Sequence, residues 1–186
     1  MRTRPLSEVP PRELRPLLDE EAATWERDLS WDFSEVRTAI AGGVERGNLQ
    51  GRAVVEGSRA VAYCYFMADA ARVIVGSIFA SCTRRGRGLE DELALAVVAD
   101  ARRERGSGRI ECQTLFCSSS AADGCFEREG FTSRARHYMR RDLGEPLPPA
   151  GTAPPGLALR PLRREDLGAA AEIVFRSHAG TVDAAL

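Results

Sequence analysis

Three arginines and two glycines lie close together in residues 83–90, which read Thr-Arg-Arg-Gly-Arg-Gly-Leu-Glu. Guanidinium groups form forked, charge-assisted hydrogen bonds with phosphate oxygens. Glycines allow a loop to direct several backbone N–H groups at one point, and the N-terminus of a following helix adds partial positive charge. The residue types and their spacing therefore predict a binding site for a phosphate or pyrophosphate. For the loop taken by itself, an ordinary exposed turn is the alternative interpretation.

The sequence on either side of this loop predicts the elements that position it. An apolar run over 73–80 is typical of a buried strand. From Leu89 onward, apolar residues recur at helical spacing as far as Gly106. Two common phosphate-binding motifs are excluded, because the chain has no lysine for a Walker loop and lacks the third glycine of the dinucleotide fingerprint. The expected order is therefore strand, arginine-glycine loop and helix.

The remaining segments up to residue 143 predict a mixed α/β domain. Further strands are expected at 4–6, 52–56, 59–67, 109–116 and 132–143. Further helices are expected from Pro16 to about Trp25, from a cap at Ser34 to Gly47, and from a cap within 118–120 to Glu129, with Gly130 as its stop. The helical spacing itself begins at Pro10-Pro11, but Pro16 is expected to break or kink it, so the helix is taken to start at Pro16.

Two helix faces follow from the same periodicity. On the first helix, Glu20, Glu21 and Glu26 are expected on the face opposite the apolar residues. On the second helix, the inward-facing residues are expected to be Val36, Ile40 and Val44.

Two segments resemble motifs of the GNAT acetyltransferase superfamily. Residues 85–90, Arg-Gly-Arg-Gly-Leu-Glu, are similar to the family's acyl-CoA pyrophosphate loop, Arg/Gln-x-x-Gly-x-Gly/Ala, in all but the last position. Residues 126–131, Phe-Glu-Arg-Glu-Gly-Phe, are similar to the Tyr-Glu-x-x-Gly-Phe ending of a short helix in the family. The resemblance covers residues 4–143. It implies an α/β fold in which helices flank a central, mostly antiparallel sheet.

The resemblance also implies an activity: an N-acetyltransferase that takes acetyl-CoA as co-substrate and transfers acetyl to an amine of a small molecule or peptide. The backbone near Phe79 would then polarise the thioester carbonyl. The residues that the resemblance places in the acyl-CoA site are Ile78, Phe79, Arg84, Arg85, Gly86, Arg87, Gly88 and Leu89.

Candidate proton acceptors are few. Glu111 lies in the middle of a strand beside the cofactor strand and is the candidate catalytic base. The alternative is a structural carboxylate paired with an arginine such as Arg109 or Arg134. Tyr63 and Tyr65 share one strand face and are candidates to line an acceptor pocket, with core packing as the alternative.

Two residues depart from the family pattern. Phe126 stands where the family often has a tyrosine that protonates the departing thiolate, and it has no proton to donate. Glu90 stands where the loop should end in glycine or alanine, and its carboxylate would repel a pyrophosphate if it pointed inward. These departures leave open an inactive GNAT fold that serves as a structural or acyl-CoA-sensing half of a tandem protein. A phosphate-binding module unrelated to CoA would fit the loop but not residues 130–131.

Composition restricts the remaining possibilities. The 186 residues suffice for one substantial domain, and a net charge of −1 argues against a nucleic-acid partner. No apolar run is long enough to span a membrane, and the N-terminus lacks the apolar core of a secretion signal. The five cysteines never occur in C-x-x-C spacing, so metal binding is not expected. A reducing, cytoplasmic location is expected instead.

The chain after residue 143 changes in character. Residues 144–156 contain five prolines and are expected to form a linker. Residues 157–186 begin with Arg160-Pro161-Leu162, which echoes Arg4-Pro5-Leu6, and then become helical. They resemble the opening strand and helix of a second, truncated GNAT-like domain. The alternative is a tail that docks on the first domain or on another copy of the chain, which would make the protein a homodimer.

Overall fold

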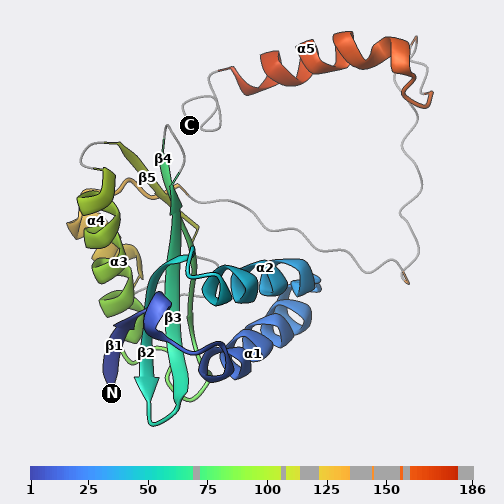
Figure 1. The fold of residues 1–186 in the computed structure, drawn as a ribbon. Coiled ribbons are helices and arrows are strands. Elements are labelled where there is room, and N and C mark those ends of the chain that lie inside the picture. The colour runs from blue at the N-terminus through green and yellow to red at the C-terminus, as the bar shows by residue number, and fades with distance from the viewer. Residues whose placement is uncertain are drawn as a thin grey trace. The chain divides into compact units, whose positions relative to one another are not determined.

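The computed structural model describes residues 1–68, 72–105, 108–113, 122–134, 144, 156 and 160–179. The chain divides into two compact units, Met1–Arg140 and Arg141–Leu186. Figure 1 shows the elements of the first unit. In chain order they are β1 (Arg2–Pro5), a short 3-10 helix (Leu6–Glu8), α1 (Pro11–Leu29), α2 (Ser34–Glu45), β2 (Gln50–Glu56), β3 (Arg59–Ala68), β4 (Arg72–Ala80), α3 (Leu89–Arg105), β5 (Arg109–Cys112) and α4 (Ala122–Arg128).

The five described strands form one sheet in the order β1-β2-β3-β4-β5. The first three pairings are antiparallel, and β5 pairs with β4 in parallel at the edge of the sheet. A tight turn with Gly57 at φ 62° joins β2 to β3. The parallel pairing runs from Arg72–Arg109 to Val75–Cys112. The strand β4 therefore links the antiparallel part of the sheet to its parallel edge.

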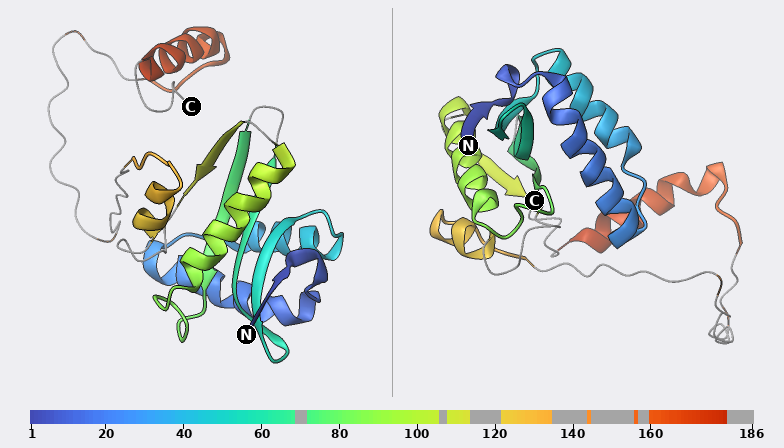
Figure 2. Two further views of the ribbon diagram at one scale, coloured as in Figure 1. Left: turned by 90° about the vertical axis from the view of Figure 1, so that its left-hand side faces the viewer. Right: turned by 90° about the horizontal axis from the view of Figure 1, so that it is seen from below.

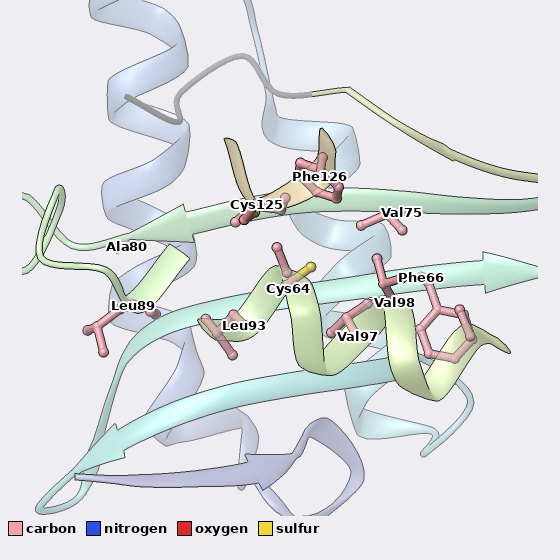
Figure 3. Close-up of a cluster of buried hydrophobic side chains, with 14 of the residues drawn as sticks. Cys64, Phe66, Val75, Ala80, Leu89, Leu93, Val97, Val98, Cys125 and Phe126 are labelled. Atoms are coloured by element: carbon pink, nitrogen blue, oxygen red, sulfur yellow. The ribbon is translucent and has the colours of Figure 1, made fainter. Parts of the chain in front are cut away.

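Helices cover both faces of this sheet. Seen from below, α1 and α2 lie on one side of the strands and α3 on the other (Figure 2). Leu93, Val97 and Ala101 of α3 are completely buried, and their spacing of four residues places them on one helix face. Figure 3 shows this face packed against side chains from β3, β4 and α4. Truncating one such core side chain typically costs about 2–5 kcal/mol, so α3 is firmly fixed to the sheet.

The alternation of side chains along β3 separates the two halves of the core. Tyr63 and Tyr65 pack on the α1 side, whereas Cys64 and Phe66 pack on the α3 side. Phe79 of β4 joins the tyrosines beneath α1. The two faces of β3 and β4 therefore pack against different helix layers.

Two expectations about the first helices are wrong. The helix α1 begins at Pro11, and Pro16 lies inside it. Proline suits the first helical position because its fixed φ is already helical, and Pro16 then removes only one hydrogen bond of a 19-residue helix. In α2, Ile40 and Val44 are buried as predicted, but Val36 is 38% exposed because it lies in the first turn, at the edge of the packed face.

The cap of α2 also differs from the prediction. Ser34 is the first helical residue, and Phe33 precedes it as the capping residue. The carboxylate of Asp32 accepts a hydrogen bond from the Ser34 N–H at 2.9 Å. Asp32, two residues earlier, therefore accepts the N–H of the first helical residue, and the Ser34 hydroxyl does not cap the helix.

The β2–β3 hairpin, β4 and α3 are confirmed, and β1 begins two residues before its predicted start and ends one residue before its predicted end. The helix α4 ends at Arg128, and two residues later Gly130 has a φ of 84°, the left-handed conformation that stops a helix. Residues 132–134 are not in a strand, and the rest of the strand predicted over 132–143 lies outside the described residues. So do residues 114–121, which contain the end of one predicted strand and the predicted cap of α4.

The second unit contains a short 3-10 helix (Arg164–Asp166) and α5 (Leu167–His178). Asp166 accepts a hydrogen bond from the Arg163 N–H at 2.8 Å, and its two oxygens receive the guanidinium of Arg160. The predicted helix is confirmed. The described part of the strand predicted at 157–162 is not extended into a sheet, because 160–163 lie outside regular structure. None of the described helices is long and apolar enough to cross a membrane.

Candidate functional site

The arginine-glycine loop connects the end of β4 to the start of α3. Both ends are fixed, because Ala80 and Leu89 are buried in the same core cluster (Figure 3). The N–H of Ser81 donates to the carbonyl of Val61 at 2.9 Å, and the Ser81 carbonyl accepts from two N–H groups of the following turn at 2.8 Å. The loop is therefore a built structure held on two rigid elements.

Two glycines of this loop adopt left-handed backbone conformations. Gly86 has φ 71° and Gly88 has φ 85°. A Cβ atom at either position would meet nothing within 4 Å, so these glycines are needed for backbone geometry and not for space. Within the described residues, the N–H groups of Arg87 and Gly88 have no protein acceptor. Successive free N–H groups at a helix N-terminus form a concave site for an anion.

Glu90 points into this loop. The side chain is only 5% exposed, and its carboxylate accepts a hydrogen bond from the Gly86 N–H at 2.9 Å. The sequence left the direction of this side chain open. Because the carboxylate faces inward, a pyrophosphate in the loop would meet a negative charge unless Glu90 moved away.

The three arginines of the loop have different environments. Arg84 pairs with the carboxylate of Glu56 at the end of β2, with distances of 2.6 and 2.8 Å. The guanidinium carbon of Arg85 lies 5.0 Å from the centre of the Phe79 ring, a cation–π contact. Arg87 is exposed and forms no ion pair with any other described residue. Arg87 is therefore the arginine most readily available to a ligand.

The predicted strand residues Ile78 and Phe79 lie on opposite faces of β4, toward α3 and α1 respectively. On one edge β4 pairs with β3, through Cys64–Ile78 and Tyr63–Phe79. On its other edge the pairing with β5 ends at Val75 within the described residues. The described parallel pairing therefore covers only the first part of β4, before residues 76–80.

The pairing of β3 with β4 contains a bulge at this same point. Between the Cys64–Ile78 and Phe66–Val75 pairs, β4 has one residue more than β3, so Gly76 and Ser77 together oppose Tyr65. A Cβ atom on Gly76 would lie 2.1 Å from the ring carbon that bears the Tyr65 hydroxyl. Glycine is required here because the tyrosine ring lies against the backbone.

A buried carboxyl lies beneath α1, beside the bulge. Glu21 is 1% exposed. It accepts hydrogen bonds from the Tyr63 hydroxyl and, at 3.3 Å, from the Trp25 indole N–H. The Ser77 side chain also hydrogen-bonds to Glu21 and to Tyr63. Four polar side chains from α1, β3 and β4 therefore meet in one network around the buried carboxyl.

Burial dominates the electrostatics of this network. Removal from water raises the pKa of Glu21 above its ordinary value of 4.5, although hydrogen bonds from Tyr63, Ser77 and Trp25 and the charge of Arg85 oppose the rise. Burial, followed by the nearby Glu21 charge, raises the pKa of Tyr63 well above its ordinary value. The network holds a proton more tightly than the same groups would in water.

Sequence reasoning missed this network, because Glu21 was expected with Glu20 and Glu26 on the outer face of the first helix. Glu26 is exposed, but Glu21 turns toward the sheet, and Glu20 reaches the N–H of Cys82 at 2.6 Å. The shared strand face of Tyr63 and Tyr65 was the available signal. It could not identify the helix residue that their hydroxyl groups approach.

Glu111 lies elsewhere. It is in β5 opposite Ile74 and forms ion pairs with Arg109, at 2.6 Å from its Nε, and with Arg72, at 3.1 Å. Partial burial opposes ionisation, but the hydrogen bonds from Arg109 and Arg72 hold the pKa of Glu111 below its ordinary value. The ion pair with Arg109 matches the structural alternative. A role as base stays a prediction, and it has less support than the pairing.

Phe126 lies in the core on the α3 side, next to Phe131 at 5.1 Å between ring centres. Figure 3 shows it beside Cys125 near β4. The ring packs as an ordinary apolar side chain. Among the described residues, no group of three or more histidine, cysteine or acidic side chains is arranged to hold a metal ion.

No protein-family model matches this sequence, and no curated protein matches it. Solved structures match its fold. One, described as a probable acetyltransferase, has a TM-score of 0.51 at 16% identity and covers 78% of this chain and 100% of its own. A GCN5-related N-acetyltransferase from Ralstonia eutropha JMP134 has a TM-score of 0.53 at 15% identity, covering 77% and 99%. A predicted acetyltransferase from Clostridium acetobutylicum, with acetyl-CoA, has a TM-score of 0.51 at 13% identity, covering 76% and 96%.

Identities this low transfer no residue's role. They do bear on the arrangement of elements, which is the mixed α/β architecture predicted from the sequence, with a mostly antiparallel sheet flanked by helices. The chain has the fold of GNAT acetyltransferases.

Proposed function

We propose that this protein is an N-acetyltransferase that binds acetyl-CoA and transfers its acetyl group to an amine of a small molecule or peptide. The observation that carries the proposal is the loop between β4 and α3. It combines two left-handed glycines, the free N–H groups of Arg87 and Gly88, and an exposed arginine at one helix N-terminus. Backbone donors and an exposed cation at one point suit a pyrophosphate.

The residues present fit an acyl-CoA with one obstruction. The N–H groups of the loop and the Arg87 guanidinium would hold the pyrophosphate. The backbone at Ile78 and Phe79, beyond the point where the described pairing of β4 with β5 ends, would hold the pantetheine arm. Acetyl-CoA supplies an acetyl group activated as a thioester. The obstruction is Glu90, whose carboxylate accepts the Gly86 N–H that a phosphate oxygen would otherwise accept.

Phe126 affects the rate of such a reaction and not its possibility. Its ring cannot protonate the departing thiolate, and it is buried in the core. A thiol has an ordinary pKa of about 8.5, so a thiolate leaves without assistance near neutral pH. A missing general acid typically costs about 10²–10⁴ in rate.

A second function is favoured by Glu90 and Phe126 together. A GNAT fold that no longer catalyses transfer could serve as a structural or acyl-CoA-sensing domain. An internal carboxylate in the loop and an apolar residue in place of the acid are both expected of such a domain. The two functions differ in turnover.

The test is thiol release from acetyl-CoA in the presence of a panel of primary amines that includes spermidine and a lysine-containing peptide. We expect release that depends on one class of amine and is reduced in Arg87→Ala. The matched control is Arg59→Ala, which removes an exposed arginine at the start of β3 and not in the loop. Acetyl-CoA binding without release for every amine would favour the sensing domain, and absence of binding would reject both the transferase and the sensing function and leave the structural one.

For the whole chain we propose a GNAT-like domain over 1–143, a proline-rich linker over 144–156, and the start of a second GNAT-like domain or a docking tail over 157–186. Two observations support a division of the chain near residue 143. The boundary between the two compact units falls after Arg140, and the core clusters contain no described residue beyond Phe131. The four described cysteines are free, which is in keeping with a cytoplasmic location. Light scattering would decide whether the chain forms a homodimer.

A further inference from the structure

We propose that Ser77 and Glu21 form the proton-accepting side of the reaction, with Ser77 in contact with the acceptor amine and Glu21 acting through it. The proposal rests on the acetyltransferase function proposed above and names the residues that would serve it. When the amine nitrogen bonds to the acetyl carbon, the carbon–sulfur bond breaks and the CoA thiolate leaves with the electron pair. The proton lost by nitrogen passes to the Ser77 oxygen as the Ser77 hydroxyl proton passes to the Glu21 carboxylate.

The first support is the burial of Glu21. Within the described residues, Glu21 and Glu90 are the only acidic side chains that are buried. A carboxyl taken out of water costs several kcal/mol unless hydrogen bonds compensate for the loss. Glu21 has such bonds, and all of them come from side chains that face it. The folded chain thus maintains a costly group at one defined place beside β4.

The second support is the composition of the network. The groups that face Glu21 are Trp25 from α1, Tyr63 and Tyr65 from β3, Ser77 from β4 and the charge of Arg85 from the loop. Hydroxyl groups can pass a proton on, whereas an arginine would only fix the charge of the carboxylate. Tyr63, Tyr65 and Glu21 are buried, but Ser77 is only partly buried. Ser77 is therefore the member that a bound acceptor could reach.

The third support is the position of Ser77 along β4. It lies in the bulge, two residues beyond Val75, where the described pairing with β5 ends. It also lies two residues before Phe79, whose ring contacts the Arg85 guanidinium, and the alternation of side chains along β4 places Ser77 and Phe79 on the same face. Bulges re-aim single side chains and occur next to active sites. The hydroxyl is thus placed between the buried acid and the β4 edge proposed to hold the pantetheine arm.

The shifted titration of Glu21 agrees with this role. Burial raises its pKa toward neutral pH, where a carboxylate is a stronger proton acceptor. Glu111, the base expected from the sequence, has a lowered pKa and is held by two arginines. Of the two carboxyls, Glu21 has the environment of a proton acceptor.

The competing explanation is that Glu21 only ties α1 to the sheet. Glu21→Gln and Ser77→Ala separate the two roles, with Glu26→Gln, an exposed residue of the same helix, as the matched control. Glutamine keeps the size of the side chain but cannot accept a proton. Each variant is titrated with acetyl-CoA by calorimetry and assayed for thiol release from acetyl-CoA, with water as acceptor and with the amine panel, from about pH 5 to about pH 9.

In the wild type we expect turnover to rise with pH. Glu21→Gln should lower kcat by about 100-fold or more and remove this pH dependence, while acetyl-CoA affinity stays within about twofold. Ser77→Ala should lower kcat by about tenfold or more at unchanged affinity. Glu26→Gln should behave as the wild type.

Two results would overturn the proposal. One is wild-type kcat and pH dependence in Glu21→Gln or, if that variant does not fold, wild-type kcat in Ser77→Ala. The other is acetyl-CoA binding by the wild type without turnover of water or any amine. Absence of acetyl-CoA binding is a different result, because it would reject the acetyltransferase function itself.

Discussion

The loop after β4 and the network beneath α1 each contain a buried glutamate, but the partners of the two carboxylates differ. Glu90 accepts a backbone N–H of the loop, next to free N–H groups and an exposed arginine. Glu21 accepts hydrogen bonds from side chains in the core. A carboxylate bound by backbone N–H groups can be displaced by another anion, whereas one bound by hydroxyl groups can exchange protons with them. The contrast suggests that the first region binds an anion and the second handles a proton.

The largest expected effect concerns the arginines of the loop. Charge-assisted contacts to phosphate are worth roughly 1.5–3 kcal/mol each. Replacing Arg85 and Arg87 with alanine should therefore weaken acetyl-CoA binding at least about tenfold, measured by calorimetry. Arg59→Ala serves as the control for lost surface charge. Unchanged affinity in the double variant would show that these arginines do not bind acetyl-CoA. The loop could then no longer be regarded as the anion-binding region.

The next effect distinguishes the glycines of the two regions. Gly76→Ala should lower the free energy of unfolding by about 1–3 kcal/mol, because its Cβ would overlap the buried Tyr65 ring. Gly86→Ala has open space and should lose only about 1 kcal/mol, from its left-handed backbone. Urea unfolding measures both, with the unconstrained Gly108→Ala as control. Equal losses of stability would contradict the conclusion that Gly76 is required because space is lacking and Gly86 because of its backbone conformation.

A smaller effect is expected at Glu90. Glu90→Gln keeps an oxygen that can accept the Gly86 N–H and removes the negative charge that faces the ligand. Acetyl-CoA binding should tighten by roughly threefold to tenfold, as the loss of one screened like-charge contact implies. Glu90→Gly, which also removes the hydrogen bond, should tighten it less if the bond holds the loop. Weaker binding in Glu90→Gln would mean that the carboxylate supports the ligand and does not compete with it.

The titration of Glu21 should affect how the stability of the protein depends on pH. Because its folded pKa is raised, the folded state binds this proton more tightly than the unfolded chain does. The stabilisation is complete below the ordinary pKa of 4.5 and is lost as the pH rises through the folded value. Glu21→Gln should therefore lose less stability than the wild type as the pH rises above about 4.5, as followed by thermal unfolding. Parallel pH profiles would show that Glu21 titrates alike in both states.

The smallest effect is expected from the C-terminal unit. Deleting 144–186 should leave the first unit folded, with a cooperative transition within about 2–4 °C of that of the full chain. Both core clusters draw their described members from residues up to Phe131, so neither glutamate depends on the tail. Insolubility of the shortened chain, or loss of its cooperative transition, would mean that the tail belongs to the same domain.

The order of elements around the loop could be predicted from the sequence because each has its own local pattern. The apolar run of β4, the helical spacing from Leu89 and the turn glycines each act over a few residues. Pro16 shows the limit of such rules. A single lost hydrogen bond was outweighed by the burial of Leu14, Leu17 and Leu18 along the same helix.

The candidate site was only half predictable for a related reason. The loop residues are adjacent in the sequence, so their common position could be inferred. The network joins Glu21, Tyr63 and Ser77 from three elements, and Tyr63 lies 42 residues from Glu21. No local pattern shows that one glutamate of an acidic helix face turns inward, nor that a bulge presents a serine to it. The inward direction of Glu90 likewise depends on a loop conformation that spacing does not specify.

The most direct test of the central claim compares two ligands on the unmodified protein. Acetyl-CoA and S-acetylpantetheine carry the same thioester, but only the first has the pyrophosphate that the loop is proposed to bind. Titration calorimetry should give saturable binding of acetyl-CoA and an affinity at least about tenfold lower for S-acetylpantetheine. Equal affinities, or no heat with either ligand, would contradict the claim that the loop between β4 and α3 is an acyl-CoA pyrophosphate site.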